Sequence, residues 1–252
     1  MPYRLFLNGT YNKLLGMGAL RVGHFCLSDI GRRREENQDA WQADPAAGLF
    51  LVSDGMGGMA GGGVASKAVA EILPKMAREK LAALPKRASK AVRDALGETL
   101  AEFSAGLREK GKENARLGGM GATVVLAFIE GRCLYLAHLG DSRAYLLSGG
   151  NLKRLTKDHS IVAVMLELGK ITPEEAEVHP ARHSMTRYAG MDGKAVADTR
   201  MLRLKGAERL LLCTDGLTNM LSDDKIRAAL AEAEGPESAC TRLVAEANEA
   251  GG

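Results

Sequence analysis

The chain has 252 residues, of which 46% are hydrophobic and 26% charged, as is usual for a globular domain. Its formal net charge is only +3, with no long basic run, so a nucleic-acid-binding protein is not indicated. The longest apolar stretch, residues 122–129, is too short to cross a bilayer, and no membrane association is expected.

Residues 1–20 are predicted to form an N-terminal extension, followed by a single domain at residues 21–252. Polar residues, among them Asn8 and Lys13, interrupt the apolar residues of the extension, which is not the pattern of a signal peptide. The four cysteines lie far apart and form no CxxC pair, so neither a disulfide framework nor a zinc site is expected. We therefore expect a cytoplasmic protein.

Short runs rich in β-branched and aliphatic residues, bounded by glycine or polar turns, predict strands. In chain order they are residues 22–28, 49–53, 122–129, 132–139, 143–147 and 209–213. The central runs are apolar on both faces; Tyr135 and Ala137 lie on one side of their strand, and Leu134 and Leu136 on the other. Such strands must be covered on both faces.

Apolar residues at helical spacing predict long helices around residues 65–76 and 92–107, joined by a loop at 82–90. Pro74 is expected to kink or divide the first helix. The segment 172–175 has the sequence of an N-cap, a first-turn proline and a capping-box glutamate, and more helices should begin near Ser222 and Pro236. Glu130-Gly131 predicts a hairpin, hence antiparallel pairing. Together these elements predict an α+β fold with two packed sheets flanked by helices.

Aspartates stand at the ends of predicted strands. Asp54, Asp141 and Asp215 each follow an apolar run and have glycine beside them, and Asp39 ends the segment 34–39. One such aspartate is most simply part of a turn. Three of them at the rim of an apolar sandwich would repel one another and have raised pKa values unless cations lay between them. Mg²⁺ or Mn²⁺ would fit, because both prefer oxygen ligands, and Gly55 would allow a backbone carbonyl to approach.

Six short motifs in this order resemble those of the type 2C, or PPM, protein serine/threonine phosphatases, in particular the bacterial members. The motifs are Gly31-x-x-Arg34-x-x-Asn37-Gln38-Asp39, Ser53-Asp54-Gly55-Met56-Gly57-Gly58, Gly119-Met120-Gly121-Ala122-Thr123, Gly140-Asp141-Ser142-Arg143-Ala144-Tyr145, Leu155-Thr156-Lys157-Asp158-His159-Ser160 and Thr214-Asp215-Gly216-Leu217-Thr218. The resemblance extends over residues 22–252.

The resemblance implies a four-layer αββα sandwich, in which two antiparallel sheets are flanked by helices and a two-metal centre lies between the sheets. The implied cofactor is Mg²⁺ or Mn²⁺, with two ions bound and a third, weaker one. The implied metal ligands are Asp54, which bridges both ions, the carbonyl of Gly55, Asp39 and Asp215, with Asp141 at the third ion.

The same resemblance implies that Arg34 and Asp54 are the catalytic residues. Arg34 would hold the substrate phosphate, a role that suits its planar fork of donors. A metal-bound hydroxide would then attack phosphorus directly, with no phosphoenzyme. The implied substrates are phosphoserine and phosphothreonine in proteins, and the implied partner is a serine/threonine kinase or its targets. Residues 156–190 correspond to a flap beside the cleft, which we expect to influence substrate choice.

Three departures from the family pattern keep other hypotheses open. The family continues after its final Gly-Gly with a metal-binding aspartate and a terminal strand, so the domain at residues 21–252 is expected to lack its C-terminal strand. Asn219 stands where many family members have aspartate, which puts the third metal in question. Met59 stands where bacterial members often have histidine, and Met56 replaces the histidine of eukaryotic members. Because we interpret His138 and His159 as structural, no general acid is assigned. A catalytically impaired domain that binds a phosphoprotein or regulator is the alternative, and a small-molecule phosphatase is a third hypothesis.

Overall fold

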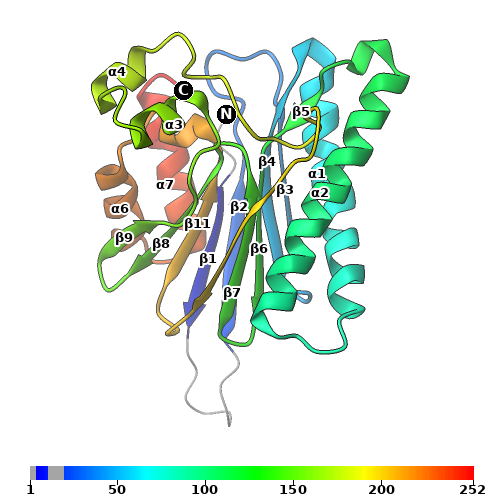
Figure 1. Cartoon of the computed structure of the whole chain (residues 1–252). Coiled ribbons are helices and arrows are strands. Elements are labelled where there is room, and N and C mark those ends of the chain that lie inside the picture. Colours follow the sequence, from blue (N-terminus) through cyan, green and yellow to red (C-terminus); the bar gives the residue numbers. More distant parts are fainter. Residues whose placement is uncertain (1–3, 11–19) are drawn as a thin grey trace.

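The computed structural model describes residues 4–10 and 20–252, with side chains for residues 20–57, 61–115 and 117–252. Two antiparallel sheets pack face to face, and helices cover the outer face of each sheet (Figure 1). The predicted α+β class and the implied αββα sandwich are confirmed. The loops of both sheets meet at one rim of the sandwich, where Asp39, Asp54, Asp141 and Asp215 lie.

The first sheet has the strand order β10-β7-β6-β4-β3, and β5 pairs with β4. In chain order its strands are β3 (Asp39–Asp44), β4 (Leu49–Met56), β5 (Gly121–Ala122), β6 (Val124–Glu130), β7 (Cys133–Leu139) and β10 (Asp198–Arg203). The long helices α1 (Gly58–Ala82) and α2 (Ser89–Glu113) cover it, and the 3-10 helix η1 (Ala115–Leu117) follows them. The β6–β7 hairpin turns directly after Glu130, as predicted.

The second sheet has the strand order β2-β1-β11-β8-β9. Its strands are β1 (Arg4–Thr10), β2 (Arg21–Leu27), β8 (Arg143–Ser148), β9 (Asn151–Arg154) and β11 (Arg209–Cys213). The helices α6 (Asp223–Glu232) and α7 (Pro236–Glu249) cover its outer face, and the short α5 (Asp215–Thr218) follows β11 directly. Two further helices, α3 (Ile161–Glu167) and α4 (Pro173–Val178), lie in the predicted flap.

Successive residues of the central strands enter different layers of the core. In β4, Leu49 and Leu51 pack against the helix layer, whereas Phe50 and Val52 pack between the two sheets. Each of these side chains is at most 2% exposed. A buried aliphatic or aromatic side chain contributes roughly 1.5–3 kcal/mol, so the period-two alternation stabilises both interfaces of this strand. The prediction of strands covered on both faces is confirmed.

The helix start signals are also confirmed, but Pro74 does not divide its helix. Thr172 and Glu175 form the predicted capping box on α4, and the Ser222 side chain caps α6. Helix α1 continues through Pro74 to Ala82. The fully buried Leu73 beside this proline anchors the helix on the sheet, and such packing offsets the loss of one backbone hydrogen bond.

Strand β1 lies in the segment that was predicted to be an extension outside the domain. Its backbone pairs with β2 on one side and with β11 on the other, in the registers Arg4↔Leu27 and Arg4↔Cys213. Residues 4–10 are therefore an inner strand of the sheet, and the rest of the predicted extension, residues 1–3 and 11–19, lies outside the described residues. The sequence signal was weak because Asn8 and Gly9 interrupt a short apolar run.

Among the described residues, no helix is long and apolar enough to cross a membrane.

Candidate active site

Four aspartates from four separate segments gather at one rim of the sandwich. Asp39 begins β3 and pairs in register with Asp54 near the end of β4. Asp141 lies in the turn between β7 and β8, and Asp215 begins α5 directly after β11. The charge of Asp54 interacts with all three of the others. The structure thus brings together the carboxylates that the sequence analysis singled out, and their role as metal ligands remains a prediction.

Asp39 is the most deeply buried of the four, with 4% of its surface exposed. The Thr214 hydroxyl donates a hydrogen bond to its Oδ2 atom at 3.2 Å. Burial raises the pKa of Asp39 to about 7, and the nearby charge of Asp215 also raises it. Without a cation, this carboxyl group would therefore carry a proton at a pH where an exposed aspartate is ionised.

Thr123 forms two hydrogen bonds with the backbone of Asp54. The Asp54 N–H donates to the Thr123 hydroxyl at 2.8 Å, and the Thr123 N–H donates to the Asp54 carbonyl at 2.8 Å. The Thr123 hydroxyl also lies 2.6 Å from that of Ser142, which follows Asp141. Burial raises the pKa of Asp54 well above its ordinary value, and the charges of Asp39, Asp215 and Asp141 add to the effect. Thr123 belongs to one of the six family motifs, but no role could be assigned to it from the sequence.

Asp141 and Asp215 interact through their charges at the same rim. Burial raises the pKa of Asp141 to about 7, with further contributions from the charges of Asp215 and Asp158. The Asn219 amide donates to Asp215 Oδ2 at 3.1 Å. Asn219 therefore orients Asp215, whereas an aspartate at this position would add another negative charge to the rim.

These donors fit hard divalent cations. Several carboxylates that repel one another in a region poor in water need either protons or positive charge, and their raised pKa values show that the protein itself supplies too little positive charge. Mg²⁺ and Mn²⁺ prefer such all-oxygen surroundings. The chemistry of the donor set thus agrees with the cofactor expected from the sequence.

Gly55, the predicted carbonyl ligand, has no side chain for a reason other than the one inferred from the sequence. A Cβ atom on Gly55 would lie 1.9 Å from the carbonyl oxygen of Gly62 in α1. The Gly55 N–H donates to the carbonyl of Gln38 at 3.0 Å. Close packing of α1 on the end of β4 therefore requires glycine here, independently of what approaches its carbonyl group.

Arg34 lies in the loop that leads into β3, and its side chain is exposed. The structure describes no hydrogen bond or ion pair of this side chain within residues 20–252. The loop rests against the end of α7, where the Arg32 N–H donates to the Gly252 carbonyl at 2.6 Å. Gly31 has a φ of 68°, and a Cβ atom there would lie 2.9 Å from the carbonyl carbon of Gly252. The backbone of the loop is thus held while Arg34 stays available to a ligand.

The raised pKa of Asp141 predicts a pH dependence of stability in the metal-free protein. Between an unfolded pKa near 3.8 and a folded pKa of about 7, the folded chain binds more protons than the unfolded chain, so the free energy of unfolding falls as pH rises. The lowered pKa values of His138 and His159, caused first by burial, act in the opposite sense.

A difference measurement cancels the histidines, which are present in both proteins. We expect Asp141→Asn to gain stability relative to the original chain between pH 4 and pH 7, as measured by urea unfolding with chelator. The exposed Asp192→Asn serves as the control and should give a flat difference. A flat difference for Asp141→Asn would contradict the prediction.

Comparison with known proteins agrees with this geometry. The model of the family described as protein phosphatase 2C matches residues 31–245. The serine/threonine phosphatase stp of Listeria monocytogenes is 32% identical over 228 residues, which cover 89% of each chain. A solved serine/threonine phosphatase of S. agalactiae is 31% identical with a TM-score of 0.79, covering 90% of this chain and 93% of that one.

The catalytic domain of the serine/threonine phosphatase PstP, solved in complex with two manganese ions, is 28% identical with a TM-score of 0.68. The match covers 100% of this chain and 94% of that chain. The chain therefore belongs to the protein phosphatase 2C family and is a metal-dependent protein serine/threonine phosphatase.

Proposed function

We propose that the acidic rim holds two divalent cations, Mg²⁺ or Mn²⁺, and that Arg34 presents the substrate phosphate to them. The observation that carries the proposal is the convergence of four aspartates from four segments, Asp39 buried and the others partly buried. Asp39, Asp54 and Asp141 have raised pKa values, and the charge of Asp215 interacts with all three. In this proposal Asp39, Asp54, Asp215 and the Gly55 carbonyl hold the two ions, and Asp141 contributes to a third, weaker position.

In this mechanism, some residues of the chain hold the aspartates in place and Arg34 binds the phosphate. Cations at this rim would lower the pKa of water and neutralise the phosphate oxygens. Thr123 and Thr214 hold the backbone of Asp54 and the carboxylate of Asp39, so that both present their oxygens in a fixed geometry. The Arg34 guanidinium donates two parallel hydrogen bonds to the phosphate and orients phosphorus toward the attacking water.

The test of this function is hydrolysis of a phosphothreonine peptide, p-nitrophenyl phosphate and a sugar phosphate with and without Mn²⁺. We expect Mn²⁺-dependent release of phosphate from the first two and a clear preference for the peptide over the sugar phosphate. Faster turnover of the sugar phosphate would favour a small-molecule phosphatase. Phosphopeptide binding without any release of phosphate would favour the impaired, binding-only domain, which gains no support from relatives that are named phosphatases.

Arg34→Ala is expected to raise KM for p-nitrophenyl phosphate more than it lowers kcat. A hydrogen bond to a charged group contributes about 1.5–3 kcal/mol, so kcat/KM should fall roughly 10- to 100-fold. Arg34→Lys should recover only part of the loss, because lysine lacks the bidentate fork. The neighbouring exposed Arg32→Ala is the control, and an equal loss in both alanine variants would count against a specific role for Arg34.

The flap, residues 156–190, is proposed to select among phosphoproteins. Helices α3 and α4 contain no buried residue, and the flap exposes large aliphatic side chains beside the rim, such as Val164, Leu168 and Val178. Surface of this kind, on a segment next to the reacting phosphate, is suited to contacting residues that flank it in a protein substrate.

The flap can be shortened without separating its ends, because Ser160 forms a β-bridge with Met185 and the Ile161 N–H donates to the Ser184 carbonyl at 2.9 Å. Replacing residues 162–183 by a short glycine-serine linker should leave p-nitrophenyl phosphate turnover in place. The ratio of kcat/KM between two phosphopeptides of different flanking sequence should change by about tenfold, equivalent to 1.4 kcal/mol. An unchanged ratio would refute the role in selection.

A serine/threonine kinase, or the proteins that it phosphorylates, is the partner that we propose for this activity. We propose the cytoplasm as its compartment, in line with four free cysteines in the described chain, a pattern typical of reducing compartments. Detection of the chain in a fractionated cell, with a kinase co-purifying, would test both points.

A further inference from the structure

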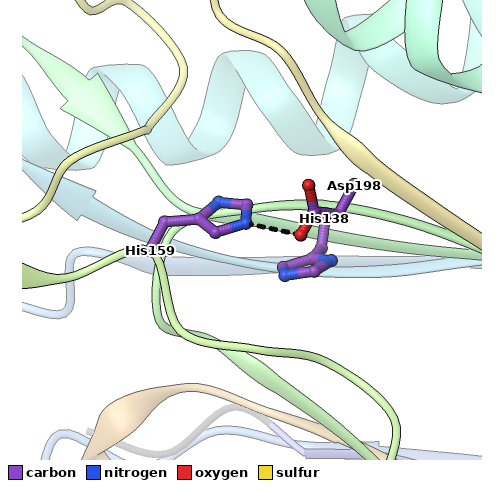
Figure 2. Close-up of side chains that lie close together, drawn as sticks. All are labelled: His138, His159 and Asp198. Carbon is purple, nitrogen blue, oxygen red and sulfur yellow. Dashed lines mark hydrogen bonds and ion pairs between the residues drawn. The ribbon is translucent and has the colours of Figure 1, made fainter. Parts of the chain in front are cut away.

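Outside the aspartate rim, the described residues contain one cluster that combines two histidines with a carboxylate. His138 lies near the end of β7, His159 lies in the loop after β9, and Asp198 begins β10 (Figure 2). The two imidazole rings stack with centroids 4.5 Å apart and an angle of 20° between their planes. One nitrogen or oxygen of each residue lies within 4.8 Å of the others, which at first suggests a metal site.

The hydrogen bonds of His159 argue against a metal ion at this cluster. Its Nδ1 atom accepts a hydrogen bond from the Gly140 N–H at 3.2 Å, so the proton of the neutral ring lies on Nε2. Nε2 in turn donates to Asp198 Oδ2 at 3.2 Å. With both nitrogens engaged, the ring has no lone pair left for a metal. Asp198 is also paired with Arg187, whose Nη1 lies 2.6 Å from Oδ1.

The charge states agree with this assignment. Burial, followed by the neighbouring His138, lowers the pKa of His159 to about 4, so its ring is neutral near pH 7. Burial alone would raise the pKa of Asp198, but its hydrogen bonds to Arg187 and His159 lower it to about 2. His159 is therefore a neutral ring that donates a hydrogen bond to the ionised Asp198 carboxylate and accepts one from the Gly140 backbone amide.

His159 holds Gly140 through two hydrogen bonds. Its ring accepts from the Gly140 N–H, and its own N–H donates to the Gly140 carbonyl at 3.0 Å. On the other side, a Cβ atom on Gly140 would lie 2.6 Å from a methyl carbon of Thr123, and Gly140 has a φ of 99°. The residue before Asp141 is thus fixed between Thr123, which also holds Asp54, and His159.

The same histidine is tied to the returning end of the flap. The Thr186 N–H donates to the His159 carbonyl at 2.8 Å, and Arg187 reaches His159 through Asp198. The helical part of the flap begins directly after His159, since Ser160 caps α3. His159, whose side chain is 1% exposed, therefore connects both ends of the flap to the turn that carries Asp141, through its backbone and through its ring.

We propose that His159 is a positioning residue that couples the flap to Asp141, and thereby sets the affinity of the third cation position. The ring bond to Gly140 keeps the Asp141 turn in place, and the bond to Asp198 keeps the flap base in place. The metal part of this inference rests on the proposed role of Asp141, whereas the mechanical part does not.

Two substitutions separate the two bonds of the ring. In His159→Asn, the Oδ1 atom can occupy the place of Nδ1 and accept from Gly140, but the side chain cannot reach Asp198. In His159→Gln, the amide can reach Asp198 but leaves the Gly140 N–H without an acceptor. His138→Gln is the control, because it retains a donor for the Lys157 carbonyl, which His138 Nε2 contacts at 2.9 Å. It removes the ring that stacks on His159, but the described His138 side chain has no hydrogen bond to Gly140 or Asp198.

Hydrogen exchange of the metal-free protein tests whether His159 couples the flap to the Asp141 turn. We expect His159→Gln to accelerate exchange of the Gly140 amide about tenfold or more, with His159→Asn and His138→Gln close to the original protein there. His159→Asn should instead accelerate exchange at residues 184–188 of the flap base. Identical patterns in the Asn and Gln variants, or unchanged protection at Gly140 in the Gln variant, would overturn the proposal.

Calorimetric titration with Mn²⁺ tests whether His159 affects the affinity of the third cation position. His159→Gln should lower the affinity of the weakest Mn²⁺-binding step several-fold and leave the tighter steps unchanged. In His159→Asn, the affinity of that weakest step should be close to that of the original protein. If the weakest step were unaffected in the Gln variant, the coupling to the cation position would be refuted. If instead the unmodified chain bound no Mn²⁺ at all, the proposed metal centre would fail, and the exchange pattern would still decide on the coupling of the flap to the turn.

Discussion

Replacing Asp54 by alanine is expected to lower kcat for p-nitrophenyl phosphate by about a thousandfold or more at saturating Mn²⁺. Asp54 is the carboxylate whose charge interacts with each of the other three in the rim, so its loss removes the centre of the cation site. Thr123 holds the backbone at this position and Asp39 is fixed in register opposite, so the rim is not expected to rearrange around the loss.

The same variant should keep its fold. Without metal, Asp54 is a buried acid that is repelled by its neighbours, so removing it is expected to leave the free energy of unfolding unchanged or higher. Circular dichroism and urea unfolding in chelator measure this, and Asp94→Ala on the outer face of α2 is the control for activity. Full activity of the Asp54 variant would end the assignment of the metal centre, whereas an unfolded protein would move the question to Asp54→Asn.

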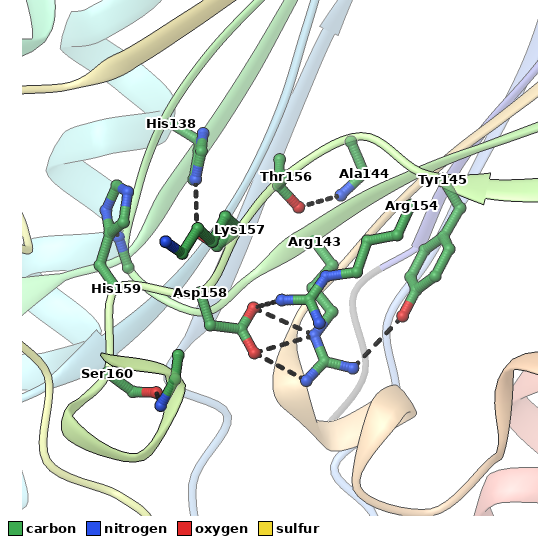
Figure 3. A network of polar contacts seen from close by, with 12 residues as sticks. His138, Arg143, Ala144, Tyr145, Arg154, Thr156, Lys157, Asp158, His159 and Ser160 are labelled. Carbon is green, nitrogen blue, oxygen red and sulfur yellow. Dashed lines mark hydrogen bonds and ion pairs between the residues drawn. The ribbon is translucent and has the colours of Figure 1, made fainter. Parts of the chain in front are cut away.

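Replacing Asp158 by alanine is expected to have the largest effect on stability. Asp158 accepts three hydrogen-bond contacts from Arg143, the shortest of 2.7 Å from Nη2, and it also pairs with Arg154 (Figure 3). The Asp158 side chain is 12% exposed and that of Arg143 is 23% exposed. Burial alone would lower the pKa of Arg143, yet its hydrogen bonds to Asp158 raise it.

Loss of Asp158 would therefore leave a largely buried guanidinium whose one remaining hydrogen-bond partner among the described residues is Tyr145, at 3.3 Å. Breaking a buried pair in this way costs about 3 kcal/mol, whereas the outer Arg154→Ala should cost about 1 kcal/mol or less. Urea unfolding of both variants tests the difference. Equal losses would show that the two arginines share the charge of Asp158 evenly and that burial of Arg143 does not matter.

The predictable part of the site was the set of aspartates and its place in the fold. Each of Asp54, Asp141 and Asp215 follows a strand that is apolar on both faces, and strands of this kind bring their ends to a common rim once two sheets pack. The family motifs added roles for Arg34 and Asp39, which no local pattern distinguishes from a solvated arginine and a turn aspartate.

Other features of the site had no local signal. Asp198 is separated from His159 by most of the flap, and the pairing of β10 with β7 brings it beside that ring. Thr123 looked like one residue of a glycine-rich turn, yet in the folded chain it links Asp54 to the turn that contains Asp141. Asparagine and glycine made Arg4–Thr10 look like an extension, and one of its two partner strands, β11, lies far away in the sequence.

The sequence by itself thus determined the class of fold, the alternation of buried side chains, the helix caps and the identity of the acidic residues. These features depend on neighbours a few positions away, whose spacing along the chain is set by strand and helix geometry. Only the tertiary structure decided where β1 pairs, why Gly55 must lack a side chain and which partners hold His159. Each of these depends on contacts between distant segments, and such contacts exist only once burial of the whole core has selected one packing among many.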